Sequence, residues 1–497
     1  MASMASRPGV SFMSRISSSG ARIAVVVTGG AMILMMTIGM LLNNSGMVYS
    51  AVTFLAFLMP LSAGLLRKGA FDPFEPINLI ALAILYGSTL RSVWLITSES
   101  SRVDFIMWRT TFDAVASNSP LILLSVMALT LGYVAMPLRW RVENAMFVRN
   151  FSMDRKRFWL AIMLTAVITL IGVPWMIAEY GISFDAGLLA ASRKRVAEYV
   201  GEDGDIIYGS GFQRWLGFAA AHGFSMLAAA MIARIVRPRP VTLAIVAALA
   251  LLAAITPFLT SSRSSLVLLL LHLCIFTFYY NRLSVRVLVT VFIISVVTLS
   301  ALGALRESNQ TGQLAENYSG FDRVLGAGNS IDFVRTSAIM DRVPEVVEFE
   351  NGRTYAALMG AFVPRAIWPD KPQVGLGSYV KGEIFGEQVR LAGWPSGMIA
   401  EGWINFGLFG LFLPLFLFGA LLRFLYESVR PLLGVSFPVT LLYAISIWRL
   451  GFGTIGMNFA HGITQTLAYL APTVVLLFIA RSPQAMRFQA RQAQSAV

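Results

Sequence analysis

The sequence NGRTYAALMGAFVPRAIWPDKPQVGLGSYVKGEIFGEQVRLAGWPSGMIAEGWINFGLFG, residues 351–410, marks the point where the longest polar segment of the chain passes into an apolar run. Charged side chains alternate here with tryptophan, phenylalanine, proline and glycine. A disordered loop would carry few aromatic and large aliphatic residues. We therefore expect this segment to fold as a lid against the remainder of the chain.

Composition places the chain among membrane proteins. Of its 497 residues, 56% are hydrophobic and 13% are charged, and the mean hydropathy is +0.69. A soluble globule of this length needs far more polar surface than that.

An apolar helix needs about 20 residues to cross roughly 30 Å of hydrocarbon. Apolar runs of about this length predict an all-α polytopic fold with about 12 transmembrane helices, at residues 22–42, 48–66, 77–97, 119–137, 158–178, 214–234, 240–260, 264–280, 287–305, 402–422, 435–454 and 461–480. Since the first run lacks a small-residue cleavage site, we expect a retained helix rather than a signal peptide. The chain then divides into 1–305 with spans 1 to 9, the large external loop 306–401, and 402–497 with spans 10 to 12 and a tail.

Lysine and arginine are distributed unequally between alternate loops. With the N-terminus inside, the cytoplasmic segments hold more than half of the 39 basic residues and few of the 26 acids. This is the bias that the positive-inside rule predicts, so both termini are expected in the cytoplasm and residues 306–401 outside. Topology and anionic lipid account for the net charge of +13, and nucleic acid is not an expected partner.

Neither a disulfide nor a metal site is expected. Cys274 is the single cysteine, and the three histidines fall in separate spans without ligand spacing. Asp203 and Asp205 lie among turn-forming glycines rather than after a strand, which favours a solvated turn over a cation site. We expect no metal and no cofactor.

Two motifs of the external loop resemble a known family. The runs VPRAIWPDKP (Val363 to Pro372) and SGMIAEGWINFGLFG (Ser396 to Gly410) are similar to the last large external loop of the Wzy-type polymerases, which join O-antigen or exopolysaccharide repeat units on undecaprenyl pyrophosphate. The hydropathy profile extends the resemblance over most of the chain. It implies a GT-C-like multi-pass protein of the bacterial inner membrane with a periplasmic active site.

The resemblance also implies the reaction and its partners. Donor and acceptor would both be undecaprenyl-pyrophosphate-linked oligosaccharides, with the growing glycan transferred to a new lipid-linked unit and no cofactor required. Besides membrane lipid, a chain-length regulator and a flippase would be partners.

Two arginines are expected to neutralise the pyrophosphate leaving group. Arg263, in TSSRSS, lies at the external boundary between two apolar runs, as a similar Ser-Arg pair does in Wzy-type polymerases and O-antigen ligases, and a charge there is costly unless partnered. Arg365 follows Pro364 and precedes Trp368 on a stiff segment. Guanidinium groups bind phosphate oxygens through two parallel bonds. The alternatives are a snorkelling helix-end Arg263 and a turn-shaping pair of Arg365 with Asp370.

Further candidates could bind pyrophosphate or glycan. They are basic, amide or aromatic side chains of the outer loops and of the start of the tenth span: Arg193, Arg195, Arg306, Arg353, Trp368, Lys371 and Asn405. Arg91 and Arg449, inside spans 3 and 11, are expected to line a lipid pathway or to pair with acids. The apolar positions around residues 331–340 favour an amphipathic helix on the membrane surface; the alternative is a helix that offers Arg335 to a lipid-linked pyrophosphate.

Glu401 is the candidate general base. Gly397, Glu401 and Asn405 are spaced four residues apart and share one helical face, among apolar neighbours. Such surroundings make a carboxylate a stronger base, which suits removal of a proton from a sugar hydroxyl. The alternative is a carboxylate that the helix dipole favours near a helix start. His461 is a minor candidate.

Two other functions stay open. An O-antigen ligase of the same superfamily would be expected to carry a catalytic histidine in its large external loop, and residues 306–401 contain none. A non-enzymatic flippase or transporter of lipid-linked oligosaccharides is the alternative from another class, against which the chain shows no matching halves of the kind that transporter repeats give.

Overall fold

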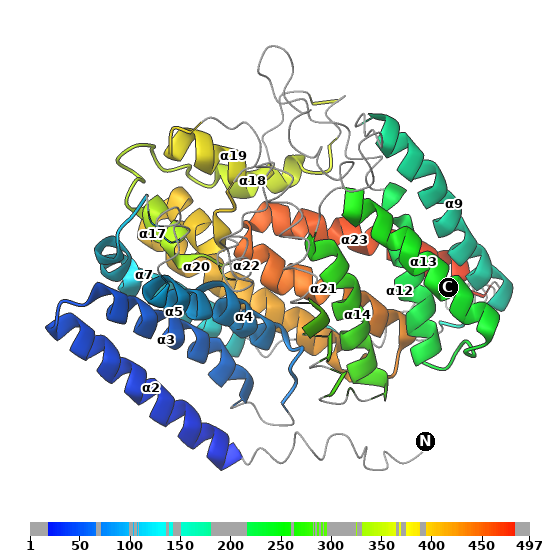
Figure 1. Cartoon of the computed structure of the whole chain (residues 1–497), viewed down its shortest axis with the longest axis horizontal. Helices are drawn as coiled ribbons and strands as arrows, with labels where there is room; N and C mark the ends of the chain where they lie inside the picture. Colours follow the sequence, from blue (N-terminus) through cyan, green and yellow to red (C-terminus); the bar gives the residue numbers. More distant parts are fainter. Residues whose placement is uncertain are drawn as a thin grey trace, which may run out of the picture. The chain divides into compact units, whose positions relative to one another are not determined.

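The computed structural model describes residues 18–65, 71–98, 103, 107, 109–135, 139–142, 151–179, 216–259, 263–281, 283, 286–287, 290–291, 293–295, 325, 331–363, 367–368, 374–387 and 394–482. Within these ranges the chain is all-helical (Figure 1). The described residues form no β-strand, and an isolated β-bridge joins Met153 to Arg481. The expectation of an all-α chain is confirmed.

Nine helices of the described part are long and apolar enough to cross a membrane. They are α2 (Ser18–Leu41), α3 (Ser45–Leu65), the continuous run α4–η1–α5 (Pro76–Thr97), α7 (Phe112–Ala135), α9 (Arg155–Glu179), α13 (Pro240–Leu259), α20 (Gly397–Val429), the run α21–η6–α22 (Phe437–Gly456) and α23 (Phe459–Ala480). Two shorter apolar helices, α12 (Ala219–Ile232) and α14 (Arg263–Asn281), coincide with the sixth and eighth expected spans. The ninth, 287–305, falls mostly outside the described residues.

The start of α7 differs from its expected position near residue 119. The helix begins at Phe112, because the polar residues that lower the hydropathy of this stretch are bonded inside the protein. The Asn118 amide donates to Ser337 Oγ at 2.9 Å and to Asp341 Oδ1 at 2.7 Å. Polar side chains with internal partners can therefore extend an apolar helix beyond the limits that hydropathy sets.

α20 consists of two helical arms, 397–405 and 408–429, joined at Phe406 and Gly407. Gly407 has φ +55° and ψ −131°, a conformation that residues with a Cβ rarely adopt. Gly402 and Gly410 approach so closely that a Cβ on either would collide with the carbonyl oxygen of the other. Eight residues of straight helix would separate them by about 12 Å. The short arm therefore folds back against the long arm.

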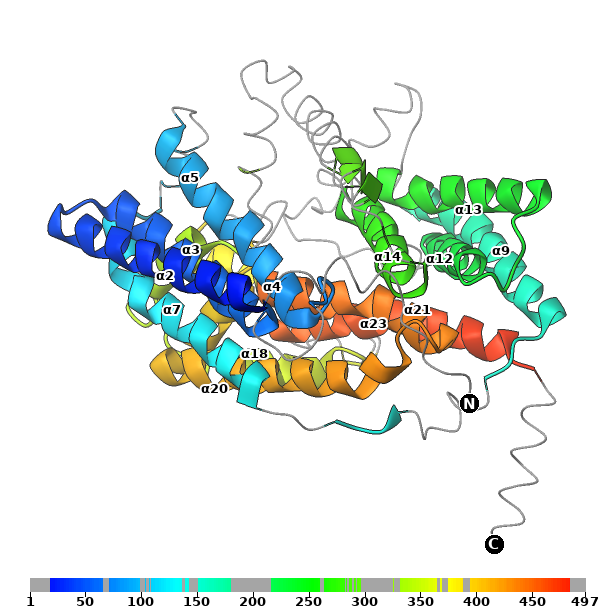
Figure 2. The same ribbon diagram turned by 90° about the horizontal axis from the view of Figure 1, so that it is seen from below.

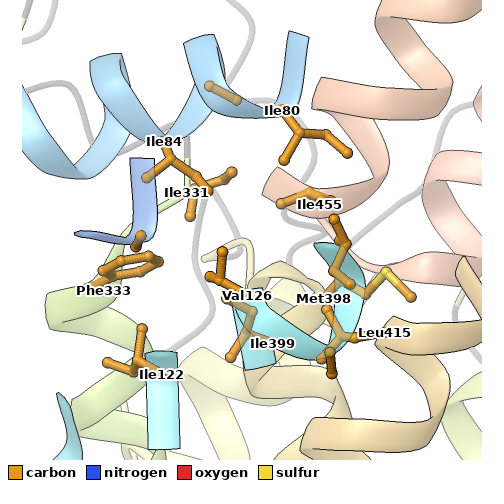
Figure 3. Packing of buried hydrophobic residues seen from close by; sticks show 14 of the residues in the cluster. Ile80, Ile84, Ile122, Val126, Ile331, Phe333, Met398, Ile399, Leu415 and Ile455 are labelled. Carbon is orange, nitrogen blue, oxygen red and sulfur yellow. The ribbon is translucent and has the colours of Figure 1, made fainter. Parts of the chain in front are cut away.

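The first compact unit comprises Met1–Trp140, Leu325–Glu427 and Ile447–Thr466. Its core joins α4, α7, α20 and α22 with the short helix α17 (Phe333–Met340) of the external loop; Figure 3 shows residues of this core. Every side chain of α17 except that of Arg335 is buried, and the helix packs against α7. The interpretation of this segment as a surface helix is wrong, because its polar residues also have partners inside the unit.

Other described parts of the external loop fold onto the short arm of α20. They include α18 (Arg353–Gly360) and α19 (Gly377–Tyr379), which continues into the π-helical turn η4 (Val380–Ile384). A small core joins α19 and η4 to the arm through Ile339, Val343, Leu376, Val380, Ile384, Ala400 and Ile404. α18 contacts the arm through Thr354. The described loop segments are thus packed parts of unit 1.

The second compact unit comprises Arg141–Val324, Ser428–Ser446 and Leu467–Val497. Within it α12 packs against α9, α13 and α14, as both views show (Figures 1 and 2). Gly223 of α12 lies so close to Thr165 of α9 that a Cβ would clash with its hydroxyl, which explains the tight approach of the two helices. His222 is buried, and its Nδ1 lies 3.0 Å from Thr473 Oγ1 of α23, so this imidazole joins two helices.

Candidate functional site

Several candidates lie outside the described residues. These are Arg193, Arg195, Arg306, Arg365 and Lys371, together with Asp203 and Asp205. Arg263 is the first residue of α14, and its side chain is not described. The described part of the site lies within unit 1, around Glu401 and around a group of arginines from α5, from the segment before α7 and from the external loop.

The Glu401 carboxylate is fully buried in the short arm of α20. Its Oε1 accepts a hydrogen bond from Thr354 Oγ1 at 3.0 Å, and its Oε2 accepts one from the backbone N–H of Phe459 at 2.6 Å. Phe459 is the first residue of α23, so Glu401 satisfies an N–H that the helix itself leaves unbonded. The Glu401 carboxylate thus caps the start of α23 and not the start of α20, the helix to which Glu401 belongs.

Asn405 completes a buried polar network with Glu401. Its side-chain amide donates to the Glu401 carbonyl oxygen at 2.7 Å and to Thr354 Oγ1 at 2.7 Å, and its Oδ1 accepts from Gly352 N at 3.0 Å. The spacing of four residues does bring Glu401 and Asn405 together, and α18 supplies Thr354 as the third member. This network sets the position of α18 relative to the short arm.

An aromatic wall encloses this network. The Tyr355 ring is stacked with Phe406 at a centroid distance of 6.3 Å and meets Phe459 edge-on at 5.8 Å. Burial raises the pKa of the Tyr355 hydroxyl well above its ordinary value, and the negative charge of Glu401 adds to the shift. Water is therefore largely excluded around the carboxylate.

Arg353 and Trp368 take no part in this network. The Arg353 side chain is 70% exposed, and its Nε lies 2.7 Å from Glu350 Oε2. Trp368 is 44% exposed and lies beside Gly360 at the end of α18. His461, in the first turn of α23, has its Nε2 2.8 Å from the side-chain nitrogen of Gln465.

A second group of polar contacts, formed by arginines, lies near the start of α20. Arg91 Nη1 lies 2.9 Å from Asp332 Oδ2, and both side chains are about 95% buried. Arg335 also reaches Asp332, at 3.4 Å, and donates to the Pro395 carbonyl oxygen at 3.0 Å. Pro395 precedes α20 by two residues, so Arg335 ties these charges to the arm that carries Glu401. Of the two expectations for Arg91, pairing with an acid is confirmed.

Arg109 and Arg342 extend this group. Arg109 is ion-paired with Glu387, and its guanidinium carbon lies 3.5 Å from the centroid of the Trp394 ring. The guanidinium carbon of Arg342 lies 4.6 Å from the centroid of Phe385, whose ring packs edge-on against Trp394. Aromatic faces hold both guanidinium groups by cation–π attraction.

We call Arg91, Arg109, Arg335 and Arg342 with Asp332 and Glu387 the cationic cluster. Burial lowers the pKa of Arg335; Asp332 opposes this shift, whereas Arg91 and Arg109 add to it. Burial likewise lowers the pKa of Arg109, against its hydrogen bond to Glu387 and with a contribution from Arg342. The charges of Arg91 and Arg109 therefore act on Arg335, and the charge of Arg342 acts on Arg109.

Local backbone geometry marks the neighbourhood of the intramembrane arginines. Arg91 follows the π-helical turn η1 (Leu85–Thr89), and Arg449 is the first residue of the π-helical turn η6 (Arg449–Gly453). Turns of this type are rare and occur frequently at functional sites. α4 packs against η6, so the two segments are neighbours in unit 1.

Sequence reasoning missed part of this group. It singled out Arg91 by its position inside a span, and Arg335 entered as an alternative, but Asp332, Arg109, Arg342 and Trp394 were not identified. A buried charge demands a partner, which was a signal for an acid near Arg91. Arg109 and Arg342 lie in segments of ordinary composition and carried no such signal.

No family model, curated protein or solved structure matches this chain. Among the described residues, no group of three or more His, Cys, Asp or Glu side chains is arranged to hold a metal ion. The chemistry of the site therefore depends on the buried carboxylate, the cationic cluster and the aromatic rings around them.

Proposed function

We propose that the protein polymerises lipid-linked oligosaccharide repeat units, transferring the growing glycan from undecaprenyl pyrophosphate to a new lipid-linked unit. The observation that carries this proposal is the cationic cluster, which is tied through Arg335 and Pro395 to the arm that bears Glu401. The two motifs of the external loop support the same function by resemblance.

The cluster suits an anionic leaving group. Arg91 and Arg335 both contact Asp332, Arg109 pairs with Glu387, and Arg342 lies over the Phe385 ring, so four guanidinium groups lie in one region of unit 1. An incoming diphosphate would meet several positive charges there. Guanidinium forks match phosphate oxygens and are already held in position by Asp332, Glu387 and the aromatic rings.

The reaction assigns separate roles to the two groups. As the bond between the donor sugar and the diphosphate breaks, the diphosphate leaves with the lipid, and the arginines neutralise the charge that develops on it. A hydroxyl of the acceptor sugar forms the new glycosidic bond and gives its proton to the Glu401 carboxylate. Arg263 and Arg365 remain candidates for the same cationic role.

Glu401 must become accessible for this step. Both of its oxygens are bonded and the side chain is fully buried. The bond from Thr354 can open by rotation of one hydroxyl, whereas the bond from Phe459 belongs to the start of α23. We therefore assign the acceptor hydroxyl to Oε1, in exchange for Thr354, with Gly407 as the hinge that lets the short arm move.

The proposal includes a location and a topology. The chain would lie in the bacterial inner membrane in a GT-C-like arrangement of twelve spans, with both termini in the cytoplasm and the site at the periplasmic face. Reporter fusions test this directly. A reporter after Ser396 should be active outside the cytoplasm and one after Arg430 inside; the reverse pattern would place the donor in the wrong compartment.

Glycan profiles of a deletion strain test the function itself. Loss of a polymerase leaves single repeat units on the final acceptor, and loss of a ligase leaves polymer on the lipid carrier. Loss of a flippase removes both products. The deletion strain should carry single repeat units, and expression of the wild-type chain but not of Arg335→Gln should restore the polymer. The pattern of a ligase or of a flippase would contradict the proposal.

A further inference from the structure

Five exposed basic side chains gather at one end of unit 2. Arg155 and Lys156 begin α9, and Arg234, Arg237 and Arg239 lie in the segment that joins α12 to α13. The start of α9 and this joining segment lie at the same end of the unit in both views (Figures 1 and 2). None of the five forms an ion pair with another described residue. We call these residues the basic end.

The acid beside this group is already engaged. Asp154 precedes α9, and its Oδ1 accepts a hydrogen bond from the backbone N–H of Arg157 at 2.9 Å. The carboxylate therefore caps the helix and offsets the positive pole of its dipole. It leaves the charge of the basic end largely uncompensated.

Arg234 has a backbone conformation that favours glycine. Arg234 follows α12 with φ +59°, in the left-handed region. Ile235 N donates to Ala230 O at 2.9 Å and Arg234 N to Met231 O at 2.9 Å, which is the Schellman pattern of helix ends. Glycine is strongly preferred at this position because a Cβ is unfavourable there. The backbone therefore does not favour an arginine at this position.

The basic end borders exposed apolar side chains. Ile235 and Val241 are 47% and 71% exposed, and Leu160, one turn further along α9 than the basic residues, is 58% exposed. Pro238 and Pro240 alternate with Arg237 and Arg239 and restrict the backbone that carries these cations. Cations on a stiff segment directly beside lipid-facing residues lie at the depth of phospholipid head groups.

We infer that the basic end binds the head groups of anionic phospholipids in the adjoining leaflet. Charge complementarity selects the anionic head group, and the adjacent apolar side chains select a ligand that carries acyl chains. The inference concerns unit 2 and does not depend on the proposed polymerase activity.

Lipid binding to the purified full-length protein in neutral detergent tests this inference. Native mass spectrometry would count bound phosphatidylglycerol and phosphatidylcholine, and thermal unfolding would report their effect on the melting temperature. The wild-type chain should bind and be stabilised by phosphatidylglycerol in preference to phosphatidylcholine. Each cation removed by Arg237→Gln or Arg239→Gln should weaken phosphatidylglycerol binding about fivefold.

Arg234→Gly separates charge from folding. Without lipid this variant should unfold at the wild-type temperature or above it, because glycine suits the left-handed backbone, yet it should lose about fivefold in phosphatidylglycerol binding. The double variant Arg141→Gln/Arg286→Gln removes two exposed cations elsewhere and should bind as the wild type does.

Three results would overturn the inference. Equal binding of the two lipids would remove the role of charge, and unchanged binding by Arg234→Gly and Arg237→Gln would remove the role of these residues. Competition by inorganic phosphate at a concentration equal to that of the lipid would assign the basic end to a soluble anion.

Discussion

Unit 1 buries charged side chains near both ends of α7, and the two groups are balanced differently. At the end of α7, Tyr133 donates to Glu75 Oε1 at 2.7 Å, and Arg423 lies 3.4 Å from the same oxygen and 3.0 Å from Glu427. Tyr426 donates to Asp72 at 2.6 Å. We call these six residues the Glu75 cluster.

The comparison distinguishes a structural contact from a ligand site. In the Glu75 cluster, Glu75 is the fully buried acid and Arg423 matches its charge, while Asp72 and Glu427 are partly exposed to solvent. In the cationic cluster, Arg91 and Arg335 both contact Asp332 and Arg109 pairs with Glu387. Arg342 lies over the Phe385 ring. The Glu75 cluster joins the ends of α4, α7 and α20. In the proposed function, the guanidinium groups of the cationic cluster bind an incoming diphosphate.

The largest effect is expected from breaking the Glu75 cluster. Arg423→Ala removes the cation beside the buried Glu75 carboxylate, which should destabilise the protein by about 3–5 kcal/mol. Thermal unfolding in detergent should show a marked fall in the melting temperature, whereas Glu427→Gln, at a partly exposed pair, should cost no more than about 1 kcal/mol. An unchanged melting temperature for Arg423→Ala would remove the structural role assigned to this cluster.

Glu401→Gln should lower turnover on the order of 10²-fold or more, because an amide cannot accept the proton. The fold should persist: the amide oxygen can accept from Phe459 N and the amide N–H can donate to Thr354. Turnover of purified protein with lipid-linked substrate would be measured beside binding of that substrate, which should stay near the wild-type value.

Thr354 supplies the matched control for Glu401. Thr354→Ser keeps the hydroxyl and should retain most of the turnover, whereas Thr354→Val removes a hydrogen bond from the carboxylate. Turnover near the wild-type rate for Glu401→Gln would leave Glu401 as the cap of α23 and make His461 the next candidate base.

A smaller loss is expected when the arginines keep their charge but lose their planar fork. Arg335→Lys and Arg109→Lys should each lower turnover about tenfold or more, the scale of one charged hydrogen bond. The same exchange at Arg263 and Arg365 tests the candidates whose side chains the structure does not describe. Arg141→Lys, at an exposed site, is the control. If the Arg→Lys variants at positions 109, 263, 335 and 365 all keep full activity, the cationic site is rejected while the function stays open.

The smallest effect is expected from removing metal. Arginines can supply the positive charge that a metal would otherwise bring, so purified protein should keep full activity in excess chelator. A loss on chelation that added magnesium or manganese restores would contradict this and would return Asp203 and Asp205 to consideration.

Hydropathy predicted the helices well because each span is a local property of the sequence. The contacts that build the site are not local. Arg91 and Asp332 are 241 positions apart in the sequence, and Glu401 and Phe459 are 58 positions apart. No periodicity encodes such pairs. The burial of α17 was missed for a related reason: its polar residues suggest a surface, and their partners, such as Asn118, lie in another helix.

The break in α20 shows a second limit of sequence reasoning. The run from Gly397 to Val429 is apolar enough to read as one span. Glycines at 402, 407 and 410 permit the fold-back, but glycine is also common in straight membrane helices. At the joint, Gly407 packs against Phe349 and Phe406 packs against Gly352, and neither contact follows from a local pattern in the sequence.

Binding of undecaprenyl pyrophosphate to the purified protein tests the central claim most directly. The account predicts that Arg109→Gln/Arg335→Gln weakens binding at least tenfold, the scale of one charged hydrogen bond or more, and lowers the ligand-free melting temperature less than Arg423→Ala does, because buried Asp332 keeps its ion pair with Arg91. Wild-type affinity of this variant, or a fall in melting temperature as large as that of Arg423→Ala, would show that the cationic cluster is structural and not a ligand site.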